Sequence, residues 1–327
     1  MLWGAVSTAP HTFRRLRMTD TSTRPPLLHR VSTYLHQRPR LRLLLMIGLP
    51  AIWLVGVYGG SLLALLVQSF FRLNPFSGVL ERVISLDTWN TLFTGANTAV
   101  MIRTVSMAAV VTVACVVLAF PLAYFMARYA HKKTKTILVL AVLIPLWSSY
   151  LVRVYSWKLI LAADGIINWF VERLGMEAAL EAFLNVPGIG GPSLSISLFG
   201  QFLVFVYIWL PFMILPIHAS LERVPGSLLE ASADLGAQPA LTFRKVTWPM
   251  AIPGVAAGSI FTFSLTLGDY IIPTIIGDSS PFIGLAIYSY QGVAGNLPLA
   301  AAFSFVPIAV MAVYLTVARK FGAFEAL

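Results

Sequence analysis

The chain has 327 residues, of which 58% are hydrophobic and only 11% are charged, and its formal net charge is +10. Soluble domains usually carry about a quarter charged residues, so this composition excludes a soluble globular protein and indicates an integral membrane protein. Excess Lys and Arg in such a protein mark cytoplasmic helix ends, so the charge does not indicate nucleic-acid binding. The single cysteine, Cys115, excludes an intramolecular disulfide and a cysteine metal site.

The first segment, residues 1–42, is predicted to be a basic cytoplasmic tail. It carries eight arginines against one acid, Asp20, and a tail of this charge can lie on anionic lipid headgroups. No apolar run before Leu43 is long enough for a cleaved signal peptide. The stretch beginning Met18-Thr-Asp-Thr reads like a natural start, so we hypothesise that residues 1–17 derive from an upstream start codon.

Apolar runs of about 20 residues predict six membrane spans and hence an all-α integral membrane fold. The spans are residues 43–70, 103–126, 137–157, 198–218, 252–272 and 300–317. Prolines inside or near their ends favour packed, kinked helices over isolated anchors. The first span and its outer loop then cover residues 43–97, the main transmembrane domain covers 98–320, and a short tail covers 321–327.

Basic residues gather in alternate loops, which orients the chain. They follow the second span, lie between the fourth and fifth, and follow the sixth; they are Arg128, Lys132, Lys133, Lys135, Arg223, Arg244, Lys245, Arg319 and Lys320. The intervening loop, residues 158–197, is richer in acids than in bases, and residues 166–183 within it show helical spacing of apolar residues. By the positive-inside rule both termini are predicted to be cytoplasmic.

The most polar organised segment of the second half begins at Glu230 and ends at Pro249. Ser227 and Glu230 have the spacing of a capping box, which predicts a helix start. Gly236 is suited to a helix stop, and Pro239 to the first position of a second helix. Pro249 is predicted to end that second helix. The pattern indicates a cytoplasmic helical hairpin between the fourth and fifth spans.

Charged residues inside spans are expensive and therefore functional candidates. Four lie toward the predicted outer side: Arg103, Arg153, Lys158 and Asp269. Asp269 either forms an internal ion pair with Arg103 or Arg153, or meets a cationic substrate. Aromatic residues at the same level could form a cation–π wall for an amine.

The hairpin segment resembles the cytoplasmic loop of bacterial ABC importer permeases. That loop reads Glu-Ala-Ala, three residues, Gly, nine residues, Ile, one residue, Leu-Pro. Five positions here stand at this spacing: Glu230, Ala231, Gly236, Val246 and Pro249. Ser232, Val246 and Trp248 replace the second Ala, the Ile and the Leu. The resemblance implies six transmembrane helices of the importer permease type with a coupling hairpin between spans four and five.

A narrower resemblance connects the chain to the polyamine branch of these permeases, in particular the first permease subunit of spermidine/putrescine importers. Residues 145–157, 165–168, 210–216, 234–237 and 268–273 carry it. The resemblance implies import of a small organic solute, a polyamine, across the bacterial inner membrane by alternating access. It also implies three kinds of partner: a second permease, two ATPase subunits that bind ATP-Mg, and a periplasmic solute-binding protein.

Two sets of residues are expected to carry this function. The ATPase-coupling set is Glu230, Ala231, Asp234, Leu235, Gly236, Ala237, Phe243, Val246 and Pro249. The substrate-path set is Trp147, Tyr150, Arg153, Trp157, Tyr207, Asp269 and Tyr270. In the coupling set, Phe243 with Leu235 or Val246 is expected to supply apolar contacts to the ATPase, and Gly236 the elbow.

The chain itself is not expected to be an enzyme, to bind a cofactor or to bind a metal. Its sequence has no phosphate-cradling Gly-Lys-Ser/Thr loop and no His-Glu-x-x-His. Three alternatives stay open. They are the same machinery importing an opine-, amino-acid-derived or phosphonate-like solute, a secondary transporter or channel acting alone, and a membrane-embedded enzyme. An anionic solute would favour Arg103 and Arg153 as ligands.

Overall fold

The computed structural model describes residues 37–74, 76–278 and 280–320. Within them, five helices are long and apolar enough to cross a membrane, or six if one bent pair counts as a single span. The predicted tail, apart from residues 37–42, and residues 321–327 lie outside the described residues. The chain divides into two compact parts, residues 1–62 and 63–327.

The first predicted span is confirmed as a run of helix. It consists of α2 (Pro39–Trp53), the π-helical segment η1 (Leu54–Gly59) and α3 (Gly60–Ser69), and Leu43–Ser69 qualifies as a membrane span. The segment that follows leaves the helix in a short antiparallel pair, β1 (Arg72–Leu73) with β2 (Leu80–Glu81).

Side chains close the β1–β2 turn. Asn74 Nδ2 and Arg72 Nε donate to the Glu81 carboxylate at 2.7 and 2.6 Å. These two hydrogen bonds lower the pKa of the Glu81 carboxyl below its ordinary value. Helix α4 (Asp87–Leu92) follows, where Thr88 Oγ1 donates to the Phe71 carbonyl at 2.6 Å. The loop before the second span is therefore ordered by its own polar contacts.

Three long helices form the core of residues 63–327: α5 (Gly95–Arg128), α10 (Leu198–Glu222) and α13 (Trp248–Gly268). Glycines let α13 approach α10 closely, as small residues do between membrane helices. A methyl group on Gly254 would lie 2.5 Å from the Pro216 carbonyl oxygen, and one on Gly258 would lie 2.7 Å from Met213 Sδ. The buried side chains between α5 and α10 include Cys115.

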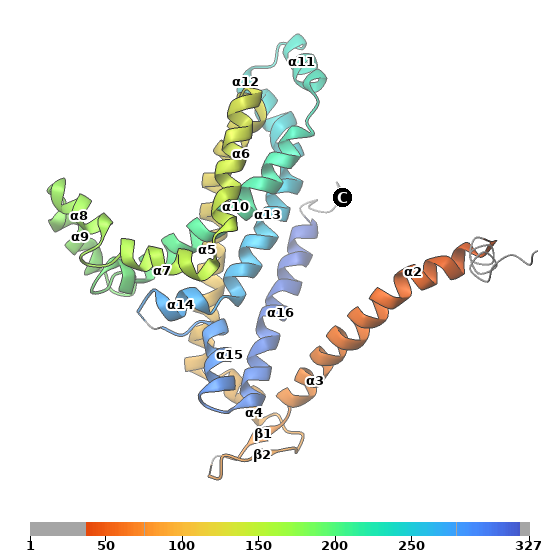
Figure 1. Ribbon diagram of the computed structural model, residues 1–327, viewed down its shortest axis with the longest axis vertical. Coiled ribbons are helices and arrows are strands. Elements are labelled where there is room, and N and C mark those ends of the chain that lie inside the picture. The colour runs from red at the N-terminus through yellow and green to blue at the C-terminus, as the bar shows by residue number, and fades with distance from the viewer. Residues whose placement is uncertain (1–36, 75, 279, 321–327) are drawn as a thin grey trace, which may run out of the picture. The chain divides into compact units, whose positions relative to one another are not determined.

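Helix α16 (Leu297–Lys320) packs beside this core, and α15 (Ile283–Gly292) lies against α16. A second apolar cluster joins α4, α5, α15 and α16 through Leu92, Val100, Ile283 and Phe303. Figure 1 shows α4 and the β1–β2 pair at one end of this bundle and helices α11 and α12 at the other. The predicted second, fourth and sixth spans are confirmed, each extended by a few residues.

The predicted third span, residues 137–157, consists of two helices joined at a sharp bend. Helix α6 (Lys132–Trp147) ends, and α7 (Tyr150–Ile160) leaves it at 96°. Ser148 and Ser149 have extended ψ angles of 151° and 136°. Both the backbone N–H and the hydroxyl of Ser148 donate to the Pro145 carbonyl, at 3.3 and 2.7 Å, so the serine offers the chain an alternative to the next helical turn.

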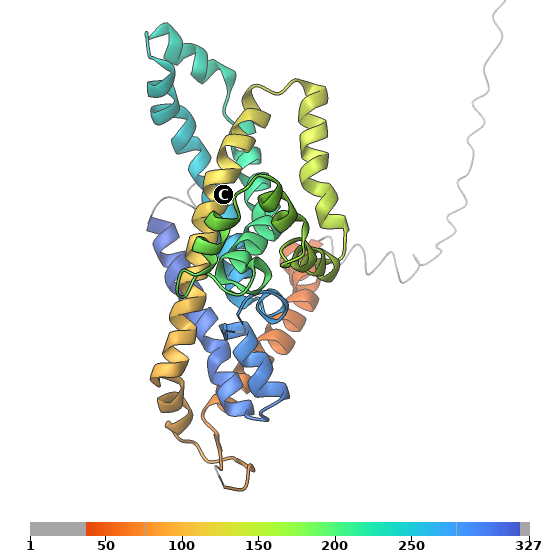
Figure 2. The same ribbon diagram turned by 90° about the vertical axis from the view of Figure 1, so that its left-hand side faces the viewer.

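Beyond α7 the chain forms α8 (Ile166–Arg173), α9 (Glu177–Leu184) and the 3₁₀ turn η2 (Leu194–Ile196). The helical content predicted for residues 166–183 is confirmed. Figure 2, turned by 90°, shows α7 to α9 projecting toward the viewer instead of continuing along α6. This part of the loop therefore extends sideways from the bundle.

The predicted boundaries of the fifth span are also wrong. The helix begins at Pro239 as α12 (Pro239–Thr242), continues through the π-helical turn η3 (Phe243–Thr247) and ends with α13 at Gly268. Pro249 does not end it. Pro249 lies in the first turn of α13, directly after the π-helical turn η3. A proline ring clashes with the carbonyl four residues earlier only where the helix is regular, and η3 departs from the regular α-helical pattern there. At the other end Asp269 is extended, and α14 (Ile271–Ile275) is a separate short helix.

Close contact between α10 and α13 should make Gly254 intolerant of any side chain. We expect Gly254→Ala to lower the thermal unfolding midpoint of the purified protein, because overpacking a tight interface costs about 1–3 kcal/mol. Gly292→Ala is the matched control, since a methyl group there meets nothing within 4 Å. Equal midpoints for the two variants would contradict the close packing.

Candidate functional site

The polar hairpin predicted from the sequence consists of α11 (Gly226–Asp234) and α12. The predicted capping box is wrong. Helix α11 begins after Pro225, whose ψ is 140°, and no side chain caps its first N–H groups. Ser227 is already inside the first turn, where its hydroxyl cannot act as the cap. Glu230 is exposed on the same helix.

The helix stop predicted at Gly236 is confirmed. Gly236 has φ +74°, which a residue with a side chain rarely adopts. The Ala237 N–H donates to the Ser232 carbonyl at 3.1 Å, and the Gly236 N–H donates to the Ala233 carbonyl at 2.8 Å. These two bonds form a Schellman motif, which closes the C-terminus of α11.

The second leg of the hairpin begins as predicted, with Pro239 in the first turn of α12. Ser232 and Thr242 hydroxyls lie 2.8 Å apart and join the two legs. Because the helix continues to Gly268, the second leg and the fifth span are one element. The second leg of the hairpin therefore continues into the bundle as one helical run, with no loop between them.

Apolar residues of the hairpin divide into outward and inward sets. Leu235 is 88% exposed and Leu241 is 48% exposed. Phe243 instead packs edge-on against Phe120 and Tyr124 of α5, with ring centroids 5.8 Å apart in both pairs. Leu235 and Leu241 are therefore outward-facing apolar residues of the hairpin, whereas Phe243 joins the second leg to α5.

The remaining predicted coupling residues lie on the surface of the hairpin or at its edge. Ala231, Asp234 and Pro249 are exposed, and Ala237 and Val246 are half-buried. Their burial alone gives none of them a partner-binding role.

Basic residues hold the end of α10 where the hairpin begins. Arg128 Nη2 of α5 donates to the carbonyls of Leu221 and Val224 at 3.0 and 3.1 Å. Lys135 of α6 forms an ion pair with Glu222. Arg128 thus satisfies the carbonyl of Leu221 in the last turn of α10 and that of Val224 just beyond it, and the ion pair attaches the end of α10 to α6. The sequence shows these cations only as topology signals, so nothing in it assigns them this capping role.

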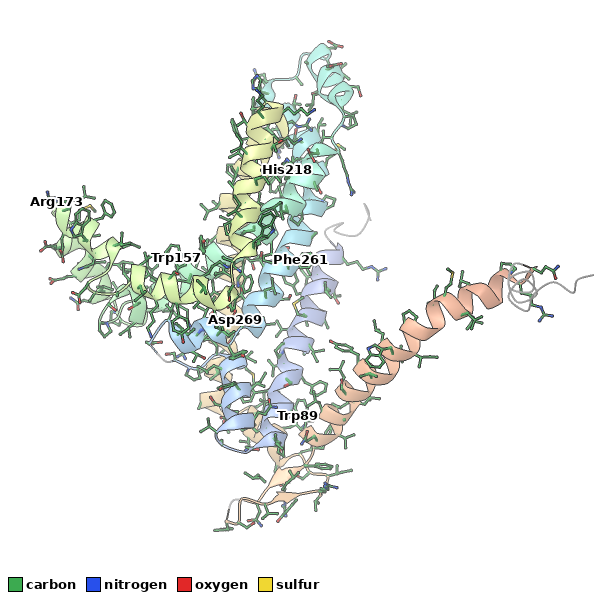
Figure 3. The ribbon with its side chains drawn as sticks, in the orientation of Figure 1. Trp89, Trp157, Arg173, His218, Phe261 and Asp269 are labelled. Carbon is green, nitrogen blue, oxygen red and sulfur yellow. The ribbon has the colours of Figure 1, made fainter. Side chains whose placement is uncertain are left out.

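A second site forms where two helices are broken. Asp269 directly follows α13, and its Oδ1 accepts the N–H groups of Ile271 and Ile272 at 2.8 and 2.9 Å. Its Oδ2 accepts a hydrogen bond from the hydroxyl of Tyr150, the first residue of α7. Figure 3 shows Asp269 partway along the bundle, between the levels of His218 and Trp89.

A cavity of about 350 Å³ lies beside this contact. Its lining residues are Tyr150, Trp209, Ser264, Leu265, Gly268, Asp269, Tyr270 and Ile271. Trp209 of α10 stacks on Tyr150 with centroids 5.8 Å apart and an interplanar angle of 18°. Trp209 is one of the aromatic residues predicted at the level of Asp269, but the predicted substrate-path set does not include it.

Of the two alternatives for Asp269, the ion pair with Arg103 or Arg153 is not formed among the described residues. Arg153 lies over the Tyr150 ring, with Cζ 6.0 Å from its centroid. Arg103 Nη1 donates weakly to the Pro281 carbonyl at 3.4 Å. Among described residues, the phenol of Tyr150 takes the place that a cation was expected to fill.

Of the five predicted substrate-path aromatic residues, only two line the Asp269 cavity. Tyr150 and Tyr270 line the cavity with Asp269. Trp157 and Tyr207 pair with each other at 5.0 Å, and Trp147 is 82% exposed. These three are not among the lining residues of the cavity.

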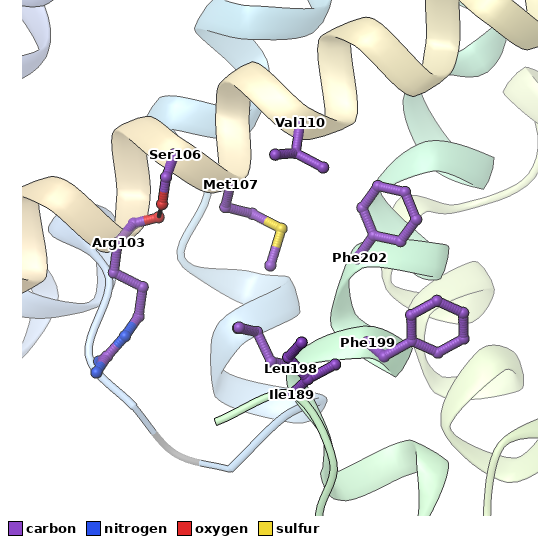
Figure 4. Close-up of a pocket in the computed structure, with 8 residues that line it drawn as sticks. All are labelled: Arg103, Ser106, Met107, Val110, Ile189, Leu198, Phe199 and Phe202. Atoms are coloured by element: carbon purple, nitrogen blue, oxygen red, sulfur yellow. Dashed lines mark hydrogen bonds between the residues drawn. The ribbon is translucent and has the colours of Figure 1, made fainter. Parts of the chain in front are cut away.

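A separate cavity of about 340 Å³ lies between α5 and the start of α10 (Figure 4). Apolar side chains line most of it, including Met107, Val110, Phe199 and Phe202. Arg103 is the charged residue of its lining. An apolar pocket with one guanidinium differs in chemistry from the carboxylate site at Asp269.

The packed apolar helices, the polar hairpin at one end and the broken helix pairs define a multi-pass helical membrane protein. Residues 119–322 match the family described as "Binding-protein-dependent transport system inner membrane component". The chain belongs to this family and is an ABC transporter permease subunit; such subunits are not themselves enzymes. The prediction of an ABC permease and of a subunit that is not itself an enzyme is confirmed.

Individual relatives agree with this membership. The chain is 51% identical over 302 residues to the inner membrane ABC transporter permease protein YdcU of Escherichia coli (strain K12), covering 92% of this chain and 96% of YdcU. It is 29% identical over 213 residues to the spermidine/putrescine transport system permease protein PotB of the same organism, covering 65% and 73%.

A solved structure shares the fold. It is the crystal structure of a bacterial alginate ABC transporter in complex with an alginate pentasaccharide-bound periplasmic protein. One of its chains matches with a TM-score of 0.66 and 16% sequence identity, over 87% of this chain and 95% of that one.

The inward packing of Phe243 should make it a structural residue. We expect Phe243→Ala to destabilise the protein by roughly 1–3 kcal/mol, because it removes a half-buried ring from an aromatic cluster. Leu235→Ala, at an exposed position, should change stability by less than about 0.5 kcal/mol. Thermal unfolding of both variants in detergent checks the assignment, and a larger loss for Leu235→Ala would contradict it.

Proposed function

We propose that this chain is one of two permease subunits of an ATP-driven importer in the bacterial inner membrane, and that its solute is a polyamine of the spermidine or putrescine class. The observation that carries the substrate class is the Asp269 carboxylate, which lines a cavity and has no cationic partner among the described residues. Similarity to PotB over 65% of the chain supports it.

The complete importer would contain a second permease, two ATPase subunits that bind ATP-Mg, and a periplasmic solute-binding protein. The alginate transporter of similar fold is in complex with a periplasmic protein, which supports the last of these partners. The lack of a phosphate-cradling sequence motif in this chain supports a separate ATPase.

The hairpin end of the bundle is proposed to face the cytoplasm, together with both termini. Lys132, Lys133 and Lys135 begin α6 near this end, and Arg244 and Lys245 lie in the second leg of the hairpin. Basic residues concentrate on the cytoplasmic side of membrane proteins. The ATPase would therefore meet α11 and α12, where Leu235 and Leu241 offer exposed apolar side chains for a helix-in-groove contact.

Transport would proceed by alternating access. Closure of the ATPase dimer would move the hairpin, and the continuous helix from Pro239 to Gly268 would carry that movement to the Asp269 cavity. There a polyamine ammonium would find a carboxylate and the faces of Tyr150, Trp209 and Tyr270, which can add cation–π attraction.

One observation favours a second candidate, in which the same machinery imports an anionic solute. Arg103 stands alone as the charged residue of an otherwise largely apolar cavity. Nε of Arg153 is buried and has no hydrogen-bond partner in the described part of the chain. Isothermal titration of the partner solute-binding protein with spermidine, putrescine and an opine or phosphonate would separate the two candidates.

The elbow at Gly236 gives a direct test of the coupling role. We expect Gly236→Val to insert and assemble but to lose coupling between substrate and ATP hydrolysis, because a β-branched residue is strained at φ +74°. The measurement is ATP hydrolysis by the reconstituted complex with and without loaded binding protein. Gly226→Val is the matched control, because its side chain would enter open space at ordinary φ. Normal substrate-stimulated hydrolysis by Gly236→Val would refute the elbow's role.

The carboxylate at Asp269 tests the substrate class. We expect Asp269→Asn to lower polyamine uptake by roughly tenfold or more, since a charge-assisted hydrogen bond to the ammonium is lost. The amide keeps an acceptor for the Ile271 and Ile272 N–H groups, so the yield of assembled complex should stay near that of the wild type. Asp278→Asn, at an exposed position, controls for the charge change. Unchanged uptake kinetics would exclude Asp269 from the substrate path.

A further inference from the structure

The two broken helices meet at a single side-chain contact. Tyr150 opens α7 immediately after the break between α6 and α7, and Asp269 stands at the break between α13 and α14. The two residues are 119 positions apart in the chain and are joined by the hydrogen bond from the Tyr150 hydroxyl to Asp269 Oδ2. This contact is therefore the direct polar link between the two breaks.

The two oxygens of the Asp269 carboxylate have different roles. Oδ1 accepts two backbone N–H groups of α14 and is structurally committed. Oδ2 accepts the neutral phenol of Tyr150 and, among the described residues, forms no ion pair. A carboxylate shielded from water favours a cationic donor over a neutral one, because an ammonium adds Coulomb attraction to the hydrogen bond. Oδ2 is thus the oxygen that a cation can take over.

The surroundings of Tyr150 leave room for such an exchange. The cavity of about 350 Å³ reaches both Tyr150 and Asp269. Trp209 stacks on one side of the phenol ring, and the Arg153 guanidinium lies 6.0 Å from the ring centroid. Both contacts hold the ring through its faces and leave the hydroxyl group free to change partner.

We propose that Tyr150 occupies the ammonium subsite of Asp269 in the empty transporter, and that an ammonium group of the substrate displaces the Tyr150 hydroxyl from Oδ2. This inference rests on the proposed function, because it takes a cationic amine as the solute. It makes Tyr150 a specificity-determining residue, since a neutral solute cannot replace a phenol at a carboxylate with a gain in free energy.

Displacement also has a mechanical consequence. While the hydrogen bond holds, α7 is tied to the end of α13, the helix that continues into the hairpin. When the substrate takes Oδ2, α7 is released and α13 is free to move. The exchange would couple occupancy of the cavity to the conformation of the helix that reaches the ATPase.

The test uses the complete complex in nanodiscs with its binding protein. In Tyr150→Phe the tie is absent, so ATP hydrolysis without substrate should rise by roughly tenfold, the shift expected for loss of one hydrogen bond to a charged group. The further increase caused by spermidine-loaded binding protein should shrink correspondingly. Tyr155→Phe is the control, because this tyrosine lies on the same helix but is 54% exposed.

The possible outcomes distinguish the role of the Tyr150–Asp269 hydrogen bond, here called the tie, from the proposed polyamine function. Unchanged basal hydrolysis in Tyr150→Phe, or an equal rise in Tyr155→Phe, overturns the inference even when spermidine stimulates the wild type. If spermidine does not stimulate the wild type but Tyr150→Phe still raises basal hydrolysis, the tie stands and the polyamine assignment fails. Should Tyr150→Phe not assemble, Asp269→Asn serves instead, because it weakens the same bond and keeps the N–H acceptor; a basal rate equal to the wild type would then overturn the tie.

Discussion

A backbone inside a membrane must find partners for its own N–H and C=O groups, because lipid offers none. Every break in a helix of this permease therefore needs a local substitute for the missing turn. At the end of α6 the Pro145 carbonyl takes both donors of Ser148. At the end of α13 the Asp269 carboxylate takes the first N–H groups of α14. Both breaks are thus built from polar groups, and this places polar chemistry at positions where a continuous helix would have none.

The same constraint acts at the hairpin end of the bundle. Arg128 supplies donors to the last carbonyls of α10, and the Schellman motif at Gly236 supplies them to the last carbonyls of α11. In both places the group that hydrogen-bonds the free backbone carbonyls also sets the direction in which the chain leaves the helix. Residues that satisfy the backbone are therefore hard to separate from residues that carry function. Asp269 illustrates this, because one of its oxygens holds α14 while the other faces Tyr150.

Several local signals in the sequence are confirmed by the structure, although the capping box predicted at Ser227 and Glu230 is not. Apolar runs give the spans, Gly236 gives a helix stop, and Pro239 gives a helix start. Other predictions fail where the membrane environment or a residue distant in the sequence determines the local structure. Pro249 reads as a helix end by the rules of soluble proteins, yet a π-helical turn admits it. The sequence left Asp269 either an arginine partner or a cationic substrate, but its side-chain partner is a tyrosine 119 positions away, which spacing alone does not reveal.

The wrong prediction of a helix end at Pro249 has the largest consequence for the proposed mechanism. A helix ended at Pro249 would place a joint between the hairpin and the fifth span, and movement of the hairpin could be absorbed there. The observed helix runs without interruption from Pro239 to Gly268, 30 residues or about 45 Å. Phe243, near its start, packs on α5, and Asp269 directly follows its end. One element thus begins at the proposed ATPase contact and ends at the proposed substrate site. In such an arrangement the two sites need no chain of intermediate contacts, because displacement or rotation of a single helix changes both.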